Sequence, residues 1–179
     1  MIRSILYWGS LAGLIVGGLL FATTVSMADQ PPSMSLGMIL GYTGMLVALS
    51  LIFVAVKRHR DRAQGGVIRF WPAFAMGLGI SLVAGVFYVL AWEAALAVSG
   101  MDFGAKYAEM LLDQRRAAGA GAEELATYAA ELEAFRVQYA NPLYRIPMTF
   151  TEIVPVGVLV SLVSAALLRN PRFMPLRRG

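Results

Sequence analysis

Two glutamates, Glu93 and Glu152, lie in or beside long apolar stretches, where acidic side chains are rare. Tyr42 and Arg145 occupy sequence positions that place them at a similar depth. Paired carboxylates suit proton or cation binding, general acid–base catalysis or structural ion pairing. Because an ionised carboxylate costs about 2.5–3.5 kcal/mol at a bilayer centre, it needs a partner or a function. We predict that these four residues form one polar cluster.

Two interpretations of this cluster remain open. In the first, Arg145 and Tyr42 compensate the carboxylates and fix the geometry of a helix bundle. In the second, the carboxylates bind a proton, a cation or a ligand. Catalysis is disfavoured because no nucleophile, metal-ligand set or glycine-rich phosphate loop occurs at a recognisable spacing. We therefore expect no enzyme, no metal site and no cofactor. Pro155 removes a backbone donor and predicts a helix kink beside Glu152.

Four apolar stretches must position these side chains. Each is close to the length of about 20 residues that a helix needs to cross a bilayer core of about 30 Å. The stretches are Ile5–Val25, Leu36–Val56, Phe70–Trp92 and Ile146–Leu168. Hydrophobic residues make up 58% of the 179-residue chain, a composition typical of membrane proteins. The sequence predicts one all-α domain (1–179), a transmembrane bundle of four helices at about 5–25, 36–56, 70–97 and 146–168.

Basic residues are sorted by loop, and this sorting predicts the topology. Arg3 precedes the first stretch, five basic residues lie between Lys57 and Arg69, and four lie in the C-terminal tail. The connection that contains Asp29 has none. Because short loops rich in Lys and Arg stay in the cytoplasm, we expect both termini there. The first connection and the segment before the fourth stretch are then outside.

The first stretch also resembles a secretory leader, because Arg3 precedes it and small residues follow it at Ser26 and Ala28. The apolar region of a leader has about 7–15 residues, and Ile5–Val25 is longer. We therefore expect a retained helix; cleavage would leave the later topology unchanged.

Small residues recur at four-residue spacing in every stretch, and they predict close helix packing. Lipid is as apolar as leucine, so close backbone approach takes the place of hydrophobic burial. The other interpretation is a chance enrichment of glycine. The predicted packing positions are Gly9, Gly13, Gly17, Gly37, Gly41, Gly77, Ser81, Gly85, Gly157 and Ser161.

The polar segment 101–144 predicts an external helical hairpin. Gly119 and Gly121 separate two apolar stripes of helical spacing, and Asn141 and Pro142 end the second helix. The stripes are expected to lie against each other, the bundle or the membrane surface. A solvated cap and a partner-binding surface are equally open as roles. The stripes are Phe103, Tyr107, Met110 and Leu111, then Leu125, Tyr128, Leu132, Phe135 and Tyr139.

The basic run after the second stretch predicts contact with the lipid bilayer. Lys57, Arg58, Arg60 and Arg62 are expected to contact anionic lipid headgroups. His59, the single histidine, fits a solvated interfacial position. The net charge of +4 does not predict nucleic-acid binding, because the charge is sorted by loop.

Several motifs together resemble a known family, domain of unknown function 4199 (DUF4199). The resemblance covers essentially the whole chain and departs from the family pattern at His59, where an aromatic residue is expected. It implies a small four-helix protein of a bacterial cytoplasmic membrane, carries no established activity, and draws attention to Tyr42, Glu93, Glu152 and Pro155. The motifs are Gly41-Tyr42, Ile52-Phe53, Lys57–Asp61, Gly65–Ile68, Tyr88–Glu93, Asn141-Pro142, Thr149–Gly157 and Ser161–Ala165.

Two function classes follow. The first is an interaction, accessory or structural protein, which works with a membrane-protein partner or a second copy. The second is a small transporter or channel component that uses Glu93 and Glu152. Four tightly packed helices leave little room for an aqueous path, which favours the first class.

Overall fold

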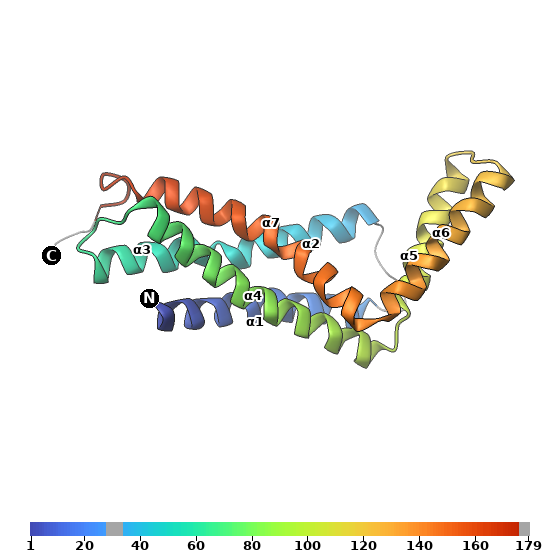
Figure 1. The fold of residues 1–179 in the computed structure, drawn as a ribbon, viewed down its shortest axis with the longest axis horizontal. Coiled ribbons are helices and arrows are strands. Elements are labelled where there is room, and N and C mark those ends of the chain that lie inside the picture. Colours follow the sequence, from blue (N-terminus) through green and yellow to red (C-terminus); the bar gives the residue numbers. More distant parts are fainter. Residues whose placement is uncertain (28–33, 176–179) are drawn as a thin grey trace.

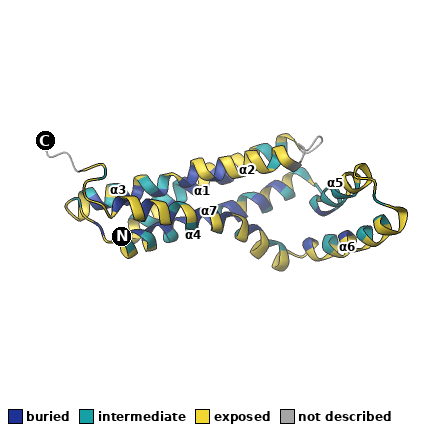
Figure 2. Ribbon diagram, turned by 90° about the horizontal axis from the view of Figure 1, so that it is seen from above, coloured by how far each residue is buried: buried dark blue, intermediate teal, exposed yellow. Residues whose placement is uncertain are grey.

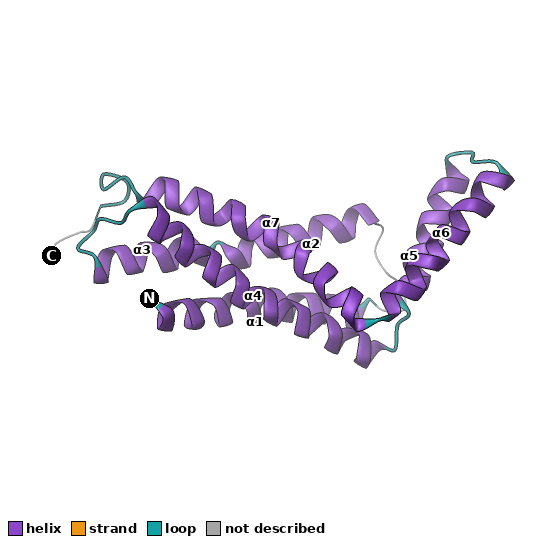
Figure 3. Ribbon diagram, in the orientation of Figure 1, coloured by secondary structure: helices purple, strands orange, loops and turns teal. Residues whose placement is uncertain are grey.

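The computed structural model describes residues 1–27 and 34–175, and every regular element within them is an α-helix (Figure 3). The connection around Asp29, Ala28 of the leader-like motif, and Arg177 and Arg178 of the tail lie outside the described residues. The predicted all-α class is confirmed. The helices are α1 (Ile2–Ser26), α2 (Met34–Leu49), α3 (Leu51–Ala63), α4 (Phe70–Ser99), α5 (Phe103–Ala117), α6 (Ala122–Ala140) and α7 (Pro142–Leu168).

Four helices are long and apolar enough to cross a membrane: α1, the combined α2 and α3 (Ser35–Ala63), α4 and α7. Each extends past its apolar stretch, because polar residues continue the helix. The fourth begins at Pro142, before the predicted start near residue 146. The Asn141 side chain accepts a hydrogen bond from the Leu143 amide at 3.0 Å, and Pro142 suits the first helical position. This earlier start places Arg145 inside α7.

α4 lies at the centre of the bundle and packs along both α1 and α7 (Figure 1). A Cβ atom added at Gly9 would lie 2.6 Å from the Val83 Cβ, and one at Gly13 would lie 2.7 Å from the Phe87 Cβ. Gly17 approaches the backbone of Phe87 in the same way. The backbone of α1 therefore touches α4 along a line of glycines.

The contact between α4 and α7 is reciprocal. Gly77 of α4 faces Ser161 of α7, and Gly157 of α7 faces Ser81 of α4. Each serine hydroxyl donates to the carbonyl four residues earlier in its own helix, at 3.0 Å for Ser81 and 2.6 Å for Ser161. Gly85 leaves room for the Phe150 ring. Small residues thus let the two helices approach closely without an unpaired hydroxyl.

α2 departs from the predicted packing. The sequence predicted that Gly41 is a packing position, but a Cβ atom added there would meet nothing within 4 Å, and Gly37 is half-buried. Gly44 makes the close contact instead, with the Leu19 side chain. Residues 38–43 are all exposed, and burial begins at Gly44 (Figure 2). The prediction for Gly41 is wrong because the first half of α2 does not pack on the bundle.

α5 and α6 pack side by side as a hairpin that projects beyond one end of the bundle (Figure 1). We call this the hairpin end, where α4 ends at Ser99 and α7 begins at Pro142. The N-terminus and the described residues that follow α7 lie at the opposite end, which we call the tail end (Figure 1).

Replacing Gly13 with leucine is expected to lower the free energy of unfolding by about 1–3 kcal/mol or more, because the side chain collides with Phe87. Gly18→Leu is the matched control, since a Cβ atom there meets nothing within 4 Å. Thermal unfolding in detergent measures both. Equal losses in the two variants would contradict the role of close backbone approach.

Candidate functional site

The hairpin end of the α4–α7 interface contains a bidentate ion pair. The Arg145 Nε donates to the Glu93 Oε1 at 2.7 Å, and Nη2 donates to Oε2 at 2.5 Å. The third nitrogen, Nη1, donates to the Tyr139 carbonyl at 3.2 Å. The side chains of Arg145 and Glu93 are 14% and 27% exposed. Two parallel hydrogen bonds make this the strongest type of carboxylate contact that arginine forms.

Tyr139, the second-to-last residue of α6, links the hairpin to this interface. Its hydroxyl accepts a hydrogen bond from the Trp92 indole at 2.8 Å and also contacts the Thr149 side chain. All three side chains are buried. Burial raises the pKa of the Tyr139 hydroxyl to about 12, and the nearby Glu152 charge adds to the increase. Tyr139 therefore stays neutral near pH 7 and fixes where α6 meets α4 and α7.

Glu152 has a different partner. The Tyr88 hydroxyl of α4 donates to the Glu152 Oε2 at 3.1 Å. Glu152 is exposed at the flank of the bundle, and it lies about 15 Å along α7 from Pro142. The Tyr42 hydroxyl is near enough to Tyr88 for an electrostatic interaction, but Tyr42 is 49% exposed.

These contacts change the predicted cluster. We predicted that Arg145 compensates both carboxylates, but its guanidinium pairs with Glu93, and Glu152 pairs with Tyr88. The physical reason is helix geometry. Arg145 and Glu152 are seven residues apart on α7, so they share a face but are separated by about two turns. Tyr42 makes no hydrogen bond that would place it in the ion pair. Pro155 lies inside α7, in the turn after Glu152.

Sequence reasoning missed Tyr88, Trp92, Tyr139 and Thr149 as members of the site. Tyr88 and Trp92 lie four residues apart on α4, a spacing that puts both on one helix face with polar groups directed at one neighbour. Tyr139 was assigned to an apolar stripe because its ring has the right spacing. A buried tyrosine needs a partner for its hydroxyl, and that requirement was the available signal.

A cluster of aromatic rings continues from Trp92 into the hairpin. Trp92 packs edge-on against Phe103, with ring centroids 5.0 Å apart, and Phe103 contacts both Tyr107 and Tyr139. Phe135 of α6 completes the cluster against Tyr107 and Tyr139. The two predicted stripes of the hairpin therefore face each other, and their base reaches α4.

The base of the hairpin also carries an ion pair. Asp102 caps α5 by accepting from the Ala105 amide at 2.9 Å, and its other oxygen accepts from Arg136 at 2.9 Å. The Arg136 guanidinium lowers the pKa of the Asp102 carboxyl, and the Ala105 amide adds to the effect. A pocket of about 460 Å³ lies here, between Arg136, Arg145 and Leu96.

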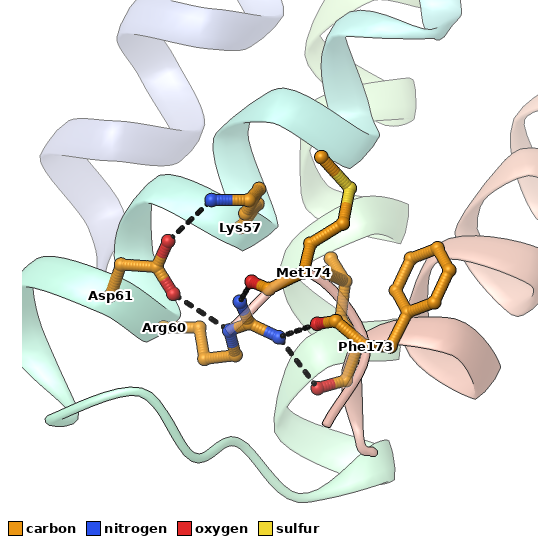
Figure 4. Close-up of polar contacts among 6 residues, drawn as sticks. Lys57, Arg60, Asp61, Phe173 and Met174 are labelled. Carbon is orange, nitrogen blue, oxygen red and sulfur yellow. Dashed lines mark hydrogen bonds and ion pairs between the residues drawn. The ribbon is translucent and has the colours of Figure 1, made fainter. Parts of the chain in front are cut away.

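The tail end is fastened by a buried arginine (Figure 4). Arg60 is 0% exposed, and its Nε donates to Asp61 at 2.8 Å. Its Nη1 donates to the Phe173 carbonyl at 3.0 Å, and Nη2 donates to the Met174 carbonyl at 2.6 Å. A longer contact of 3.5 Å reaches the Leu168 carbonyl at the end of α7. We call this set of contacts the Arg60 latch.

The Arg60 latch corrects one predicted lipid contact. Arg60 was grouped with the residues that bind lipid headgroups, but it is buried and its donors are used within the chain. Lys57 pairs with the same Asp61 at 2.6 Å (Figure 4). Arg58 and Arg62 are exposed. In residues 1–27 and 34–175, no three His, Cys, Asp or Glu side chains are grouped so that they could hold a metal ion.

The sequence model of one family, described as protein of unknown function (DUF4199), matches residues 7–170. The chain is a DUF4199 protein. The match covers all four apolar helices, apart from the first residues of α1, and the whole hairpin of this DUF4199 chain. No curated protein and no solved structure shows significant similarity to it. The family match confirms the resemblance seen in the sequence, and the family is described without an activity.

The ion pair between Glu93 and Arg145 predicts that the two side chains contribute to stability as a coupled pair. Removing one partner, in Glu93→Gln or Arg145→Gln, is expected to cost about 1.5–3 kcal/mol, because the remaining charge loses its bidentate partner. The double variant should cost less than the sum of the two. Denaturant unfolding in detergent measures this cycle, with the exposed Glu109→Gln as a control. Simple additivity would show that the two side chains are not coupled.

Proposed function

We propose that this DUF4199 protein is an interaction or accessory protein of the membrane, and that a transmembrane segment of a partner protein packs against the first half of α2 and Glu152. The observation that carries the proposal is that Glu152, an acidic residue of the apolar helix α7, is exposed at the bundle flank with Tyr88 as its hydrogen-bond partner. An acidic side chain facing lipid is costly, although less so near an interface than at the bilayer centre. A polar residue of a partner would remove that cost.

The exposure of α2 supports the same surface. In the first half of this helix, Ile39 is 63% exposed and Tyr42 is 49% exposed, whereas Met45 and Leu49 in the second half are buried. This exposed half of α2 lies on the same side of the bundle as Glu152, because Tyr42 interacts electrostatically with Tyr88, the hydrogen-bond partner of Glu152. A helix that packs along only half of its length leaves a surface where another helix fits.

The hairpin supports an accessory role at the membrane surface. We propose that α5 and α6 are external, on the side of the membrane away from the termini. Three tethers hold the hairpin base: Trp92 to Tyr139, Arg145 to the Tyr139 carbonyl, and Trp92 to Phe103. A partner that binds the hairpin would therefore act directly on α4 and α7.

The proposed location is the cytoplasmic membrane of a bacterium, with four passes and with both termini in the cytoplasm. The distribution of basic residues supports this orientation, because Arg3, Arg58 and Arg62 all lie at the tail end. The two exposed arginines of α3 and the paired Lys57 then face the anionic headgroups of the inner leaflet.

Cysteine labelling tests this orientation, and the chain has no native cysteine that would interfere. Single cysteines are placed at Ala63, the last residue of α3, and at Ala120, in the hairpin turn. In intact spheroplasts, an impermeant thiol reagent should label Ala120→Cys and leave Ala63→Cys unlabelled until the membrane is opened. Labelling of Ala63→Cys alone would reverse the orientation.

Photo-crosslinking from native membranes tests the partner. A crosslinking residue at Ile39 should give a discrete adduct of higher mass, and one at Leu90, which is 60% exposed on α4, should not. In the Ile39 protein, Glu152→Ala should reduce the adduct several-fold, while the exposed Glu131→Ala should not. Comparable patterns from Ile39 and Leu90 would contradict a specific surface.

The second function class is a transporter component in which Glu152 carries a proton. The hydrogen bond from Tyr88 and the electrostatic contact with Tyr139 favour it, because they give the carboxylate polar neighbours inside a membrane helix pair. Proton flux into proteoliposomes of the purified protein, abolished by Glu152→Gln, would support this class and would contradict a purely accessory role.

A further inference from the structure

A pocket lies at the tail end, far from the Glu152 surface. It is formed by the start of α1 and the basic part of α3, and its volume is about 340 Å³. Two arginines from different helices, Arg3 and Arg58, line it. Ser4, Tyr7 and Trp8 form the rest of the lining. The pocket therefore combines two cations with a hydroxyl group and two aromatic side chains.

The two arginines have no acidic partner. Among residues 1–27 and 34–175, no salt bridge involves Arg3 or Arg58, whereas Lys57 and Arg60 both pair with Asp61. Asp61 is also the one acidic residue between Gln30 and Trp92 in the sequence, and residues 1–28 contain none. Asp61 already pairs with Lys57 and Arg60, so the two positive charges of the pocket have no carboxylate to compensate them.

The charge and shape of the pocket determine its ligand class. Two guanidinium groups that line one pocket repel each other, and an anion between them turns that repulsion into attraction. Arginine binds phosphate through two parallel N–H···O contacts, which favours phosphate over a monatomic anion. A pocket of about 340 Å³ has ample room for a phosphodiester and the glycerol attached to it.

The aromatic residues indicate where the phosphate comes from. Tyr7 and Trp8 contact each other edge-on at 5.4 Å, and Tyr7 is 64% exposed. Both lie in the first third of α1, just before its glycine line begins at Gly9. Tyrosine and tryptophan concentrate at the level of the lipid headgroups, so this pocket opens at that level.

We propose that Arg3 and Arg58 form a binding site for the phosphate of an anionic phospholipid, with the lipid chains lying along α1 and Tyr7. The site clamps the start of α1 to α3. Here the negative phosphate attracts both positive arginines, whereas α1 is held on α4 by close backbone packing. The lipid is therefore a stabilising ligand of the bundle, independent of any partner at Glu152.

Lipid titration of the purified protein in detergent tests the site. Phosphatidylglycerol should raise the unfolding temperature at lower concentration than phosphatidylcholine, and native mass spectrometry should show it bound. In Arg3→Gln and in Arg58→Gln the apparent affinity should fall about tenfold. Arg69→Gln is the matched control, because it removes an exposed charge at the tail end, just before α4, that does not line the pocket.

The outcomes separate the sources of the phosphate. An equal shift with inorganic phosphate alone would show a free-phosphate site and overturn the assignment to lipid. An equal loss of affinity in Arg69→Gln would show a diffuse charge effect and overturn the pocket. If a glutamine variant fails to fold, Arg58→Lys keeps the charge but loses the bidentate geometry, and unchanged lipid affinity there would contradict the proposal. Loss of the Ile39 crosslink would leave these results unaffected.

Discussion

The bundle depends on the close approach of helix backbones to α4. Inside a membrane there is little hydrophobic gain from bringing apolar helices together, so van der Waals contact between backbones must hold them. Gly9 and Gly13 provide this contact on the α1 side, and the reciprocal Gly77–Ser161 and Gly157–Ser81 pairs provide it on the α7 side. With α4 held on two sides, its far end presents Tyr88, Trp92 and Glu93 at fixed positions.

Two arginine side chains add polar contacts at the two ends of α7, where the small residues do not hold it. α7 is fixed near its start by Arg145, which pairs with Glu93, and at its end by Arg60, which donates to carbonyls that follow α7. Each guanidinium makes several hydrogen bonds at once, which a lysine in the same place would not match. The two ends of α7 are therefore set by polar contacts of defined direction, and the middle of the helix is set by small residues.

Much of this fold could be predicted from local sequence. Apolar length predicts the membrane helices, and the four-residue spacing of Gly9, Gly13 and Gly17 predicts a packed face. Gly41 has a similar spacing, yet its surroundings are open, because spacing shows that a helix can be approached and not that a neighbour is there.

The candidate site was harder to predict, for a related reason. Arg145 had two carboxylates within plausible reach, and the choice of Glu93 follows from α7 starting at Pro142 rather than a turn later. Tyr139 joins the site only because the hairpin folds back onto α4. Contacts of this kind connect residues far apart in sequence, and nothing near Glu93 or Tyr139 in the chain specifies them.

The Arg60 latch has a consequence for the order in which the chain assembles. Arg60 belongs to α3, but two of its acceptors, the carbonyls of Phe173 and Met174, are synthesised more than a hundred residues later. Guanidinium stays charged at any physiological pH, so until those residues arrive α3 carries a cation without its final acceptors. Before Phe173 and Met174 are synthesised, Arg60 has Asp61 as a partner but lacks these two carbonyl acceptors. The full Arg60 latch can therefore form only after the residues that follow α7 have been added.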